Sequence, residues 1–281
     1  MYSANFDYVR ANSVAEAIAL LGTKENPRLM AGGHSLIPAM KMRLDEPGTV
    51  IDIGRISELK GINAHEGHVH IGALTTHAEI ARSDQVPAGL REAAGMVADP
   101  QVRNRGTIGG NVSHADPASD LPTILNALGA VFSLAGPTGN RMVSAGDFFT
   151  GFFETAKRKD EVLVAVEVPS AGASAYEKMA NPASGYCMVG VGVCLTVSNG
   201  VCTAARVAVG GLTPGTIRCP SVETALVGKQ MNAEAFAAAS QAAAGDLGED
   251  LIGDIHASAE YRKAMLDVYL QRALAKAAGR V

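Results

Sequence analysis

The sequence predicts an α+β protein built from two domains. The chain has 281 residues, 47% of them hydrophobic, so it can bury a large core and is long for a single domain. Helical and strand-like segments alternate up to a stretch of small residues at 170–174. Beyond it, two β-rich segments precede three helical ones, the pattern of a smaller α+β domain. We therefore expect a first domain at 1–174 and a second at 175–281.

Helix and strand signals follow one another through the first domain. Two capping boxes, Ser13 with Glu16 and Thr76 with Glu79, begin helices. Further short helices are expected at 36–42, 90–97 and 121–128. Strands are expected where β-branched residues cluster or alternate with polar ones, at 28–31, 49–53, 68–72, 130–134, 141–143 and 161–168.

The second domain opens with a hairpin. Segments 189–197 and 201–209 flank Ser198-Asn199-Gly200, residues that favour a tight turn between antiparallel strands. Helices are expected at 221–227, 233–241 and 261–278, and residues 245–258 are polar and irregular, as in a loop.

Composition excludes several classes of protein. The net charge is −4 and there is no basic stripe with aromatic residues, which argues against nucleic-acid binding. No run of 18 apolar residues predicts a membrane span, and the first residues lack the features of a signal peptide. We therefore expect a cytoplasmic location, with any attachment to a membrane made through a complex.

The cysteines and histidines do not predict a metal site. The four cysteines lack the close pairs that zinc and iron–sulfur sites require, and a buried reduced thiol is the expected state of each. The seven histidines lack the i, i+4 spacing that would place two imidazoles on one helical face.

Two glycine motifs carry the main functional signal, Ala31-Gly32-Gly33-His34-Ser35 and Thr107-Ile108-Gly109-Gly110-Asn111. Glycine lets a ligand approach the main chain closely, and successive N–H groups can form a nest for an anion. A helix that starts after such a loop adds further free donors. The two motifs predict a phosphate-bearing ligand held from two sides, although each alone could be an ordinary tight turn. Neither is a Rossmann or Walker motif, so nicotinamide and ATP are not expected.

Polar residues continue the second motif. Ser113, His114, Asp116, Ser119 and Asp120 place hydroxyls, an imidazole and carboxylates within a few residues. This density suits a sugar–phosphate or ribityl chain. The alternative is an Asx turn followed by a helix N-cap, which would account for Asp116 and Asp120 without a ligand.

These motifs together resemble the FAD-binding medium subunit of molybdenum hydroxylases, of the carbon monoxide dehydrogenase type, which is similar to the flavin domain of xanthine dehydrogenase. The resemblance extends over essentially the whole chain and includes 114–117, 167–169, 190–192 and 256–262. It implies an FAD-binding domain of the PCMH/VAO type in two α/β parts, about 1–57 and 58–174. A second domain would hold a three-stranded antiparallel sheet with packed helices.

The resemblance also implies the cofactor-binding residues. Those around the FAD pyrophosphate would be Leu29, Met30, Ala31, Gly32, Gly33, His34, Ser35, Leu36, Thr107, Gly109, Gly110 and Asn111. Ser113, His114 and Asp120 would follow the ribityl and ribose groups. Leu163 would pack against the isoalloxazine and Lys178 would lie near it; the alternatives are a core leucine and a solvated charge. Tyr186 is interpreted either as a cover for one flavin face or as an ordinary packed tyrosine.

His34 raises the question of a covalent flavin link. Larger flavoprotein oxidases carry a similar Gly-Gly-His-Ser loop in which the histidine bonds to the flavin, but they also need a substrate domain. This chain is too short to add one, so we expect noncovalent FAD.

The function implied is that of an oxidoreductase subunit. A large partner would hold the molybdenum cofactor and a small partner two [2Fe-2S] clusters, in a dimer of heterotrimers. FAD in this chain would take their electrons and pass them to an external acceptor, with no catalytic residue and no metal in the chain itself. Two alternatives are a self-contained FAD-dependent oxidase or reductase and a non-catalytic nucleotide-binding module. Neither the substrate nor the final acceptor follows from the sequence.

Overall fold

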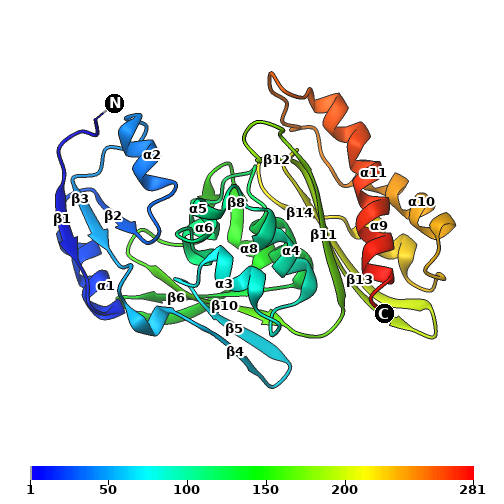
Figure 1. The fold of residues 1–281 in the computed structure, drawn as a ribbon, viewed down its shortest axis with the longest axis horizontal. Coiled ribbons are helices and arrows are strands. Elements are labelled where there is room, and N and C mark those ends of the chain that lie inside the picture. The colour runs from blue at the N-terminus through cyan, green and yellow to red at the C-terminus, as the bar shows by residue number, and fades with distance from the viewer. Residues whose placement is uncertain (1) are drawn as a thin grey trace.

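The computed structural model describes residues 2–281, which form sheets of three, five and four strands and one short two-stranded pair. The three larger sheets succeed one another along the longest dimension of the molecule (Figure 1). Helices fill the space between the second and third sheets, and the longest helix covers the far side of the third. The α+β class expected from the sequence is confirmed.

The first sheet is parallel, with the order β1 (Asp7–Arg10), β3 (Thr49–Asp52) and β2 (Pro27–Met30). Helix α1 (Val14–Thr23) connects β1 to β2, and the side chain of Ser13 caps it by accepting from the N–H of Glu16 at 3.1 Å. Helix α2 (Leu36–Lys41) and a 3-10 turn, η1 (Ser57–Leu59), complete this part. Its core includes buried residues from α1 and β3, such as Ala17 and Ile51.

The second sheet is antiparallel throughout, in the order β4-β5-β10-β6-β7. Its strands are β4 (Ile62–His65), β5 (His68–Gly72), β10 (Val162–Pro169), β6 (Val131–Gly136) and β7 (Gly139–Ser144). The expected α/β arrangement therefore describes the first part only, because hairpins and not helical crossovers join β4 to β5 and β6 to β7. Two short strands, β8 (Phe149–Gly151) and β9 (Glu154–Thr155), pair beside this sheet.

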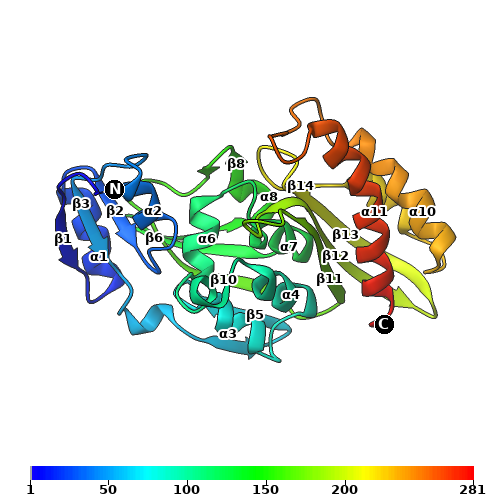
Figure 2. The ribbon, with the colours of Figure 1, turned by 45° about the horizontal axis from the view of Figure 1, so that its top comes forward.

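Helices cover one face of the second sheet (Figure 2). They are α3 (His77–Arg82), α4 (Ala88–Met96), α5 (Pro100–Arg103), α6 (Ile108–His114), α7 (Leu121–Leu128) and α8 (Ala145–Phe148). All eight residues of α7 are buried, since this helix lies between the second and third sheets. The core beneath includes Phe132 and Phe148, whose ring centroids are 4.3 Å apart.

The third sheet contains β11 (Ala173–Ala180), β12 (Cys187–Ser198), β13 (Val201–Gly210) and β14 (Ile217–Arg218), all antiparallel. Three long strands match the expected three-stranded sheet, and β14 adds a fourth strand of two residues, too short to be seen in the sequence. Helices α9 (Pro220–Leu226), α10 (Ala233–Gln241) and α11 (Ala259–Ala278) and the turn η2 (Ala242–Gly245) pack on one face. Helix α7 packs on the other.

Side-chain alternation along β12 explains how both of its faces are covered. Val189, Val191 and Val193 point to the helices of the C-terminal part, whereas Gly190 and Gly192 face the opposite side. A Cβ on Gly192 would lie 2.9 Å from the Cα of Ile124, so a larger residue would push α7 away from the sheet. The glycines near 190–192 therefore serve packing.

Strands β1, β4 and β11 and helix α6 were not predicted from the sequence, and neither were the short elements α5, α8, β8, β9 and β14 or the 3-10 turns. Strands β1 and β4 lie at sheet edges and have exposed residues that hide the alternation, and β11 begins inside the stretch read as a junction. Helix α6 was expected to be a loop, which is wrong. Two adjacent glycines lower the helix propensity of α6, but burial of Ile108 and Val112 against the core stabilises it.

Candidate functional site

The first glycine motif is an open loop between β2 and α2. Within the described residues 2–281, the backbone N–H groups of Gly32, Gly33, His34 and Ser35 have no hydrogen-bond acceptor. Gly33 has a φ of +77°, and His34 Nδ1 donates to the carbonyl oxygen of Gly32 at 3.0 Å. His34 and Ser35 are exposed. Four successive free donors at the surface fit an anionic group such as a pyrophosphate.

The residues that flank this loop face different surroundings. Leu29 packs against the core of the first part of the chain, and Met30 lines an apolar cavity of about 330 Å³ with Tyr8 and Ile37. Leu36 begins α2 and is half-buried. The free main-chain donors of the motif lie between them, at residues 32–35.

The second glycine motif is not an open nest, which corrects the expectation of a loop there. Thr107 is the N-cap of α6, and its Oγ1 accepts from the N–H of Gly110 at 3.1 Å. Gly109 N–H donates to Ala73 O at 2.9 Å and Asn111 N–H to Thr107 O at 3.0 Å. The N–H groups of Gly109, Gly110 and Asn111 thus donate within the protein. This motif would therefore contact a ligand through the exposed surface of Gly110 and through side chains.

The structure brings the two motifs together, although 71 or more residues separate them in the sequence. A Cβ on Gly32 would lie 2.0 Å from the carbonyl oxygen of Arg105 and 3.1 Å from the Cα of Gly106. A Cβ on Gly110 would lie 3.9 Å from the Cβ of Ala31. The first motif therefore sits directly against the start of α6, as one ligand held by both motifs requires.

His77 lies beneath this junction and was not predicted from the sequence. His77 is 3% exposed, and its Nδ1 has no hydrogen-bond partner among the described residues. A Cβ on Gly106 would lie 2.9 Å from both Cδ2 and Nε2 of the His77 ring. Burial, together with the charges of Arg103 and His34, lowers the pKa of His77 to about 4. The Thr76 capping box predicted the helix that carries His77 but gave no sign of this contact.

The polar residues after α6 mostly bond to one another. Asn111 Oδ1 accepts from Ser119 Oγ at 2.8 Å, and Asp116 Oδ1 accepts from the N–H of Ala118 at 2.9 Å, as in the Asx turn proposed as the alternative. The ring of His114 packs against Phe153 with centroids 5.1 Å apart. Ser113 is half-buried on the same helix.

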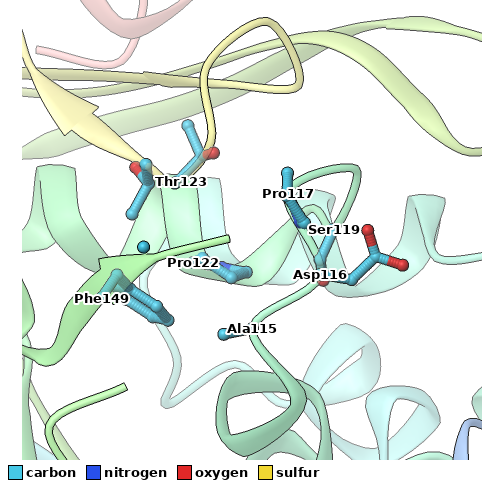
Figure 3. Close-up of a pocket in the computed structure, with 10 residues that line it drawn as sticks. Ala115, Asp116, Pro117, Ser119, Pro122, Thr123 and Phe149 are labelled. Carbon is cyan, nitrogen blue, oxygen red and sulfur yellow. The ribbon is translucent and has the colours of Figure 1, made fainter. Parts of the chain in front are cut away.

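A small cavity adjoins this turn, with Asp116, Pro117 and Ser119 on one side and Pro122, Thr123 and Phe149 nearby (Figure 3). Its volume is about 10 Å³, the space for one water molecule. It is too small for any part of a flavin.

Asp120 forms a buried ion pair in place of the N-cap that the sequence allowed. Its carboxylate accepts from Tyr176 Oη at 2.8 Å and lies 3.0 Å from Lys178 Nζ, and it makes no side-chain bond to the start of α7. Burial raises the pKa of Asp120 to about 6, and the Lys178 ammonium acts against this rise.

Lys178 is likewise not a solvated charge, since its side chain is 6% exposed. Its ammonium also donates to the carbonyl oxygens of Met96 and Gly185, each at 2.8 Å. With Asp120, these acceptors engage all three of its N–H groups. The contacts favour a role for the pair in positioning the turn at 181–186.

Tyr186 stands at the end of that turn and is 56% exposed, so it is not an ordinary core tyrosine. The N–H of Asn181 donates to its carbonyl oxygen at 2.8 Å, which closes the turn. Leu163, by contrast, is 4% exposed and belongs to the main core, which agrees with the alternative of a core leucine. A β-bulge follows it between Leu163 and Ala165.

Comparison with known proteins identifies the class. Residues 4–171 match the family described as the FAD binding domain in molybdopterin dehydrogenase, and residues 174–277 match the CO dehydrogenase flavoprotein C-terminal domain. The protein is therefore an FAD-binding oxidoreductase subunit. The chain belongs to the family of FAD-binding medium subunits of molybdenum hydroxylases, which confirms the resemblance found in the sequence.

Relatives match over their full length. The chain is 40% identical to the carbon monoxide dehydrogenase medium chain of Hydrogenophaga pseudoflava, covering 98% of this chain and 97% of that one. It is 36% identical to the nicotine 6-hydroxylase medium subunit of Paenarthrobacter nicotinovorans, covering 97% of each.

Solved structures agree with these relatives. Carbon monoxide dehydrogenase from Hydrogenophaga pseudoflava superposes with a TM-score of 0.94, covering 100% of this chain and 99% of that one at 40% identity. Quinoline 2-oxidoreductase from Pseudomonas putida 86 gives 0.93, with the same coverage at 33% identity. Among residues 2–281, no helix combines the length and apolarity needed to cross a membrane.

Proposed function

We propose that this chain is the electron-transferring subunit of a heterotrimeric molybdenum hydroxylase. FAD held here would receive electrons from iron–sulfur clusters of a small partner and deliver them to an external acceptor, while a large partner oxidises the substrate at molybdenum. The observation that carries the proposal is the full-length match to medium subunits, at 40% identity to one of them. Two such trimers would form a dimer, which we place in the cytoplasm, with any membrane attachment made through the complex.

The geometry supports a division of roles within residues 1–174, which we propose as the FAD-binding domain. The free N–H groups of 32–35 would bind the FAD pyrophosphate, and the exposed surface of Gly110 would let it lie against α6. Asn111, Ser113 and His114 would line the ribityl side. FAD supplies the redox chemistry when it is bound, and no side chain at this junction is needed as an acid or base.

Residues 175–281, the proposed second domain, would shape the flavin end of the site. Lys178 and Asp120 join this part to α4 and α7, and they hold the turn that presents Tyr186. We propose that the exposed Tyr186 ring covers one face of the isoalloxazine. Lys178 would act by holding this turn in place, because its N–H groups are already engaged.

The substrate would be chosen by a partner and not by this chain. Relatives with similar identity are named for carbon monoxide, nicotine and glyceraldehyde, at 40%, 36% and 38% identity. Such different molecules share no chemistry that one flavin site could select. The name of a relative therefore does not transfer its substrate to this chain.

Isolation of the native complex tests the proposal. The tagged chain, expressed in its own host, should bring down one larger and one smaller protein, and the complex should contain molybdenum, iron and FAD. Substrate-dependent reduction of the flavin should require all three chains. A yellow chain that purifies alone and oxidises a small molecule would favour the self-contained oxidase. A colourless chain would leave only the nucleotide-binding module.

A further inference from the structure

A cluster of metal-ligating side chains lies on the second sheet, outside the FAD site. His65 on β4, His70 on β5 and Glu167 on β10 bring one ligand atom each to within 4.8 Å of the others. The β4–β5 hairpin that carries both histidines extends away from α2 and the glycine motifs (Figure 1). The cluster is therefore a separate site.

Strand register builds the cluster from residues far apart in sequence. His70 pairs with Glu167 on one side and with Asn63 on the other, so these three side chains share one face of the sheet. His65 follows Asn63 by two residues and so points to the same face. Val69 and Val168 point to the opposite face, where they join the core.

One oxygen of the carboxylate at the centre of the cluster has no hydrogen-bond partner among the described residues. His70 Nδ1 lies 2.5 Å from Glu167 Oε1, and His65 Nε2 lies 3.8 Å from Glu167 Oε2. Glu167 Oε2 is buried and has no hydrogen-bond partner among the described residues. A buried carboxylate oxygen without a partner is costly, and a cation beside it would remove that cost.

We propose that His65, His70 and Glu167 form a binding site for a divalent zinc ion. Two imidazoles and one carboxylate are a donor set that zinc accepts, with a fourth position open to water. Ligand bonds of about 2.0–2.2 Å place the ligand atoms of a tetrahedral ion roughly 3.3 Å apart. His70 lies 2.5 Å from Oε1 and His65 lies 3.8 Å from Oε2, and one ligand atom from each residue lies within 4.8 Å of the others. The side chains would therefore have to rotate for one ion to contact all three.

The bound ion would tie the edge of the sheet to its centre. Strand β4 is the outermost strand and pairs only with β5, whereas β10 lies in the middle of the sheet. An ion held by His65 and Glu167 links the two across β5. Zinc should therefore raise the melting temperature of the chain, because it binds the folded state only where the three strands are in register.

Calorimetric titration of zinc chloride into the full-length chain, purified without a histidine tag and stripped with a chelator, tests the site. The wild type should bind one zinc ion and gain thermal stability. His65→Ala and His70→Ala should each weaken this binding by at least about tenfold, while His256→Ala, an exposed histidine elsewhere, should bind as the wild type does.

Two further measurements distinguish a variant that fails to fold from one that has lost only the zinc site. Circular dichroism of each metal-free variant should match the wild type, and Glu167→Gln should lose zinc binding with the shape of the side chain kept. FAD content should be the same in all variants. A wild type that binds no zinc, or a His65→Ala variant that binds it as tightly as the wild type, would overturn the proposal.

Discussion

The ammonium group of Lys178 lies 3.0 Å from the carboxylate of Asp120, and both side chains are 6% exposed. The pair joins the start of α7 to β11, and Lys178 adds bonds to Met96 at the end of α4 and to Gly185 in the turn before Tyr186. Four segments from both parts of the chain therefore meet at one buried charge.

Loss of the lysine charge should destabilise the protein strongly. Lys178→Met leaves the buried Asp120 carboxylate without its cation, which should lower the free energy of unfolding by about 3–5 kcal/mol in urea titrations. The matched control is Lys276→Met. Lys276 is 30% exposed in its ion pairs with Glu92 and Glu177, so this substitution should cost about 1 kcal/mol or less. Adding Asp120→Asn to Lys178→Met should restore part of the loss. Equal effects of the two lysines would contradict this account.

The contact between the glycine motifs should not tolerate a methyl group. Gly32→Ala places a Cβ 2.0 Å from Arg105 O, a backbone atom that cannot move without shifting the start of α6. We expect loss of most bound FAD and about 1–3 kcal/mol of stability. Gly22→Ala is the control, since its Cβ would meet no atom within 4 Å. FAD content per chain is the measurement, and an unchanged value in Gly32→Ala would count against the proposed pyrophosphate site.

Protonation of His77 should destabilise the folded state. Its pKa is lowered from 6.5 to about 4, so the unfolded chain binds the proton more readily. The stability linked to the neutral imidazole is fully present above pH 6.5 and is lost as the pH falls from 6.5 through 4. The total loss in the free energy of unfolding is about 3 kcal/mol. His77→Gln should reduce the difference in unfolding free energy between pH 7 and pH 4.5 by about 2 kcal/mol.

The exposed His256 supplies the control for this prediction. His256→Gln should keep the pH dependence of the wild type. If His77→Gln keeps it as well, the unpartnered buried imidazole is not the source of the acid sensitivity.

Arg262 should stabilise the loop before α11. It is 3% exposed, and its guanidinium donates to Gly211 O at 2.6 Å and pairs with Asp254 at 2.6 Å. Arg262→Leu leaves the Gly211 carbonyl without this donor and should cost about 1–3 kcal/mol in urea unfolding. The neighbouring Lys263 is exposed, and Lys263→Leu should have little effect. An unchanged free energy of unfolding in Arg262→Leu would show that the loop holds its conformation without these bonds.

The sequence predicted what depends on local pattern. The helix caps at Ser13 and Thr76, the turn at Asn199-Gly200 and the two glycine motifs are signals carried by neighbouring residues. Only Thr76 forms the full capping box, because the Glu16 side chain accepts from the N–H of Asn12 and not from that of Ser13. The family also followed from such short motifs.

Features that depend on distant contacts could not be predicted in this way. The pairing of Asp120 with Lys178 spans 58 residues and depends on how α7 packs on β11. The helix at Ile108–His114 forms because burial of its apolar residues outweighs the low helix propensity of two glycines. The buried position of His77 depends on its contact with Gly106, which is 29 residues away in the sequence. The cluster around Glu167 requires the register of three strands, which periodicity along one strand does not give.

FAD should be held by this chain without a covalent bond. The native protein should be denatured in acid and centrifuged, and the flavin in the supernatant and in the pellet should be identified by chromatography. About one FAD per chain should appear in the supernatant, and the pellet should be colourless. Flavin retained in the pellet, or a native protein that contains none, would contradict it.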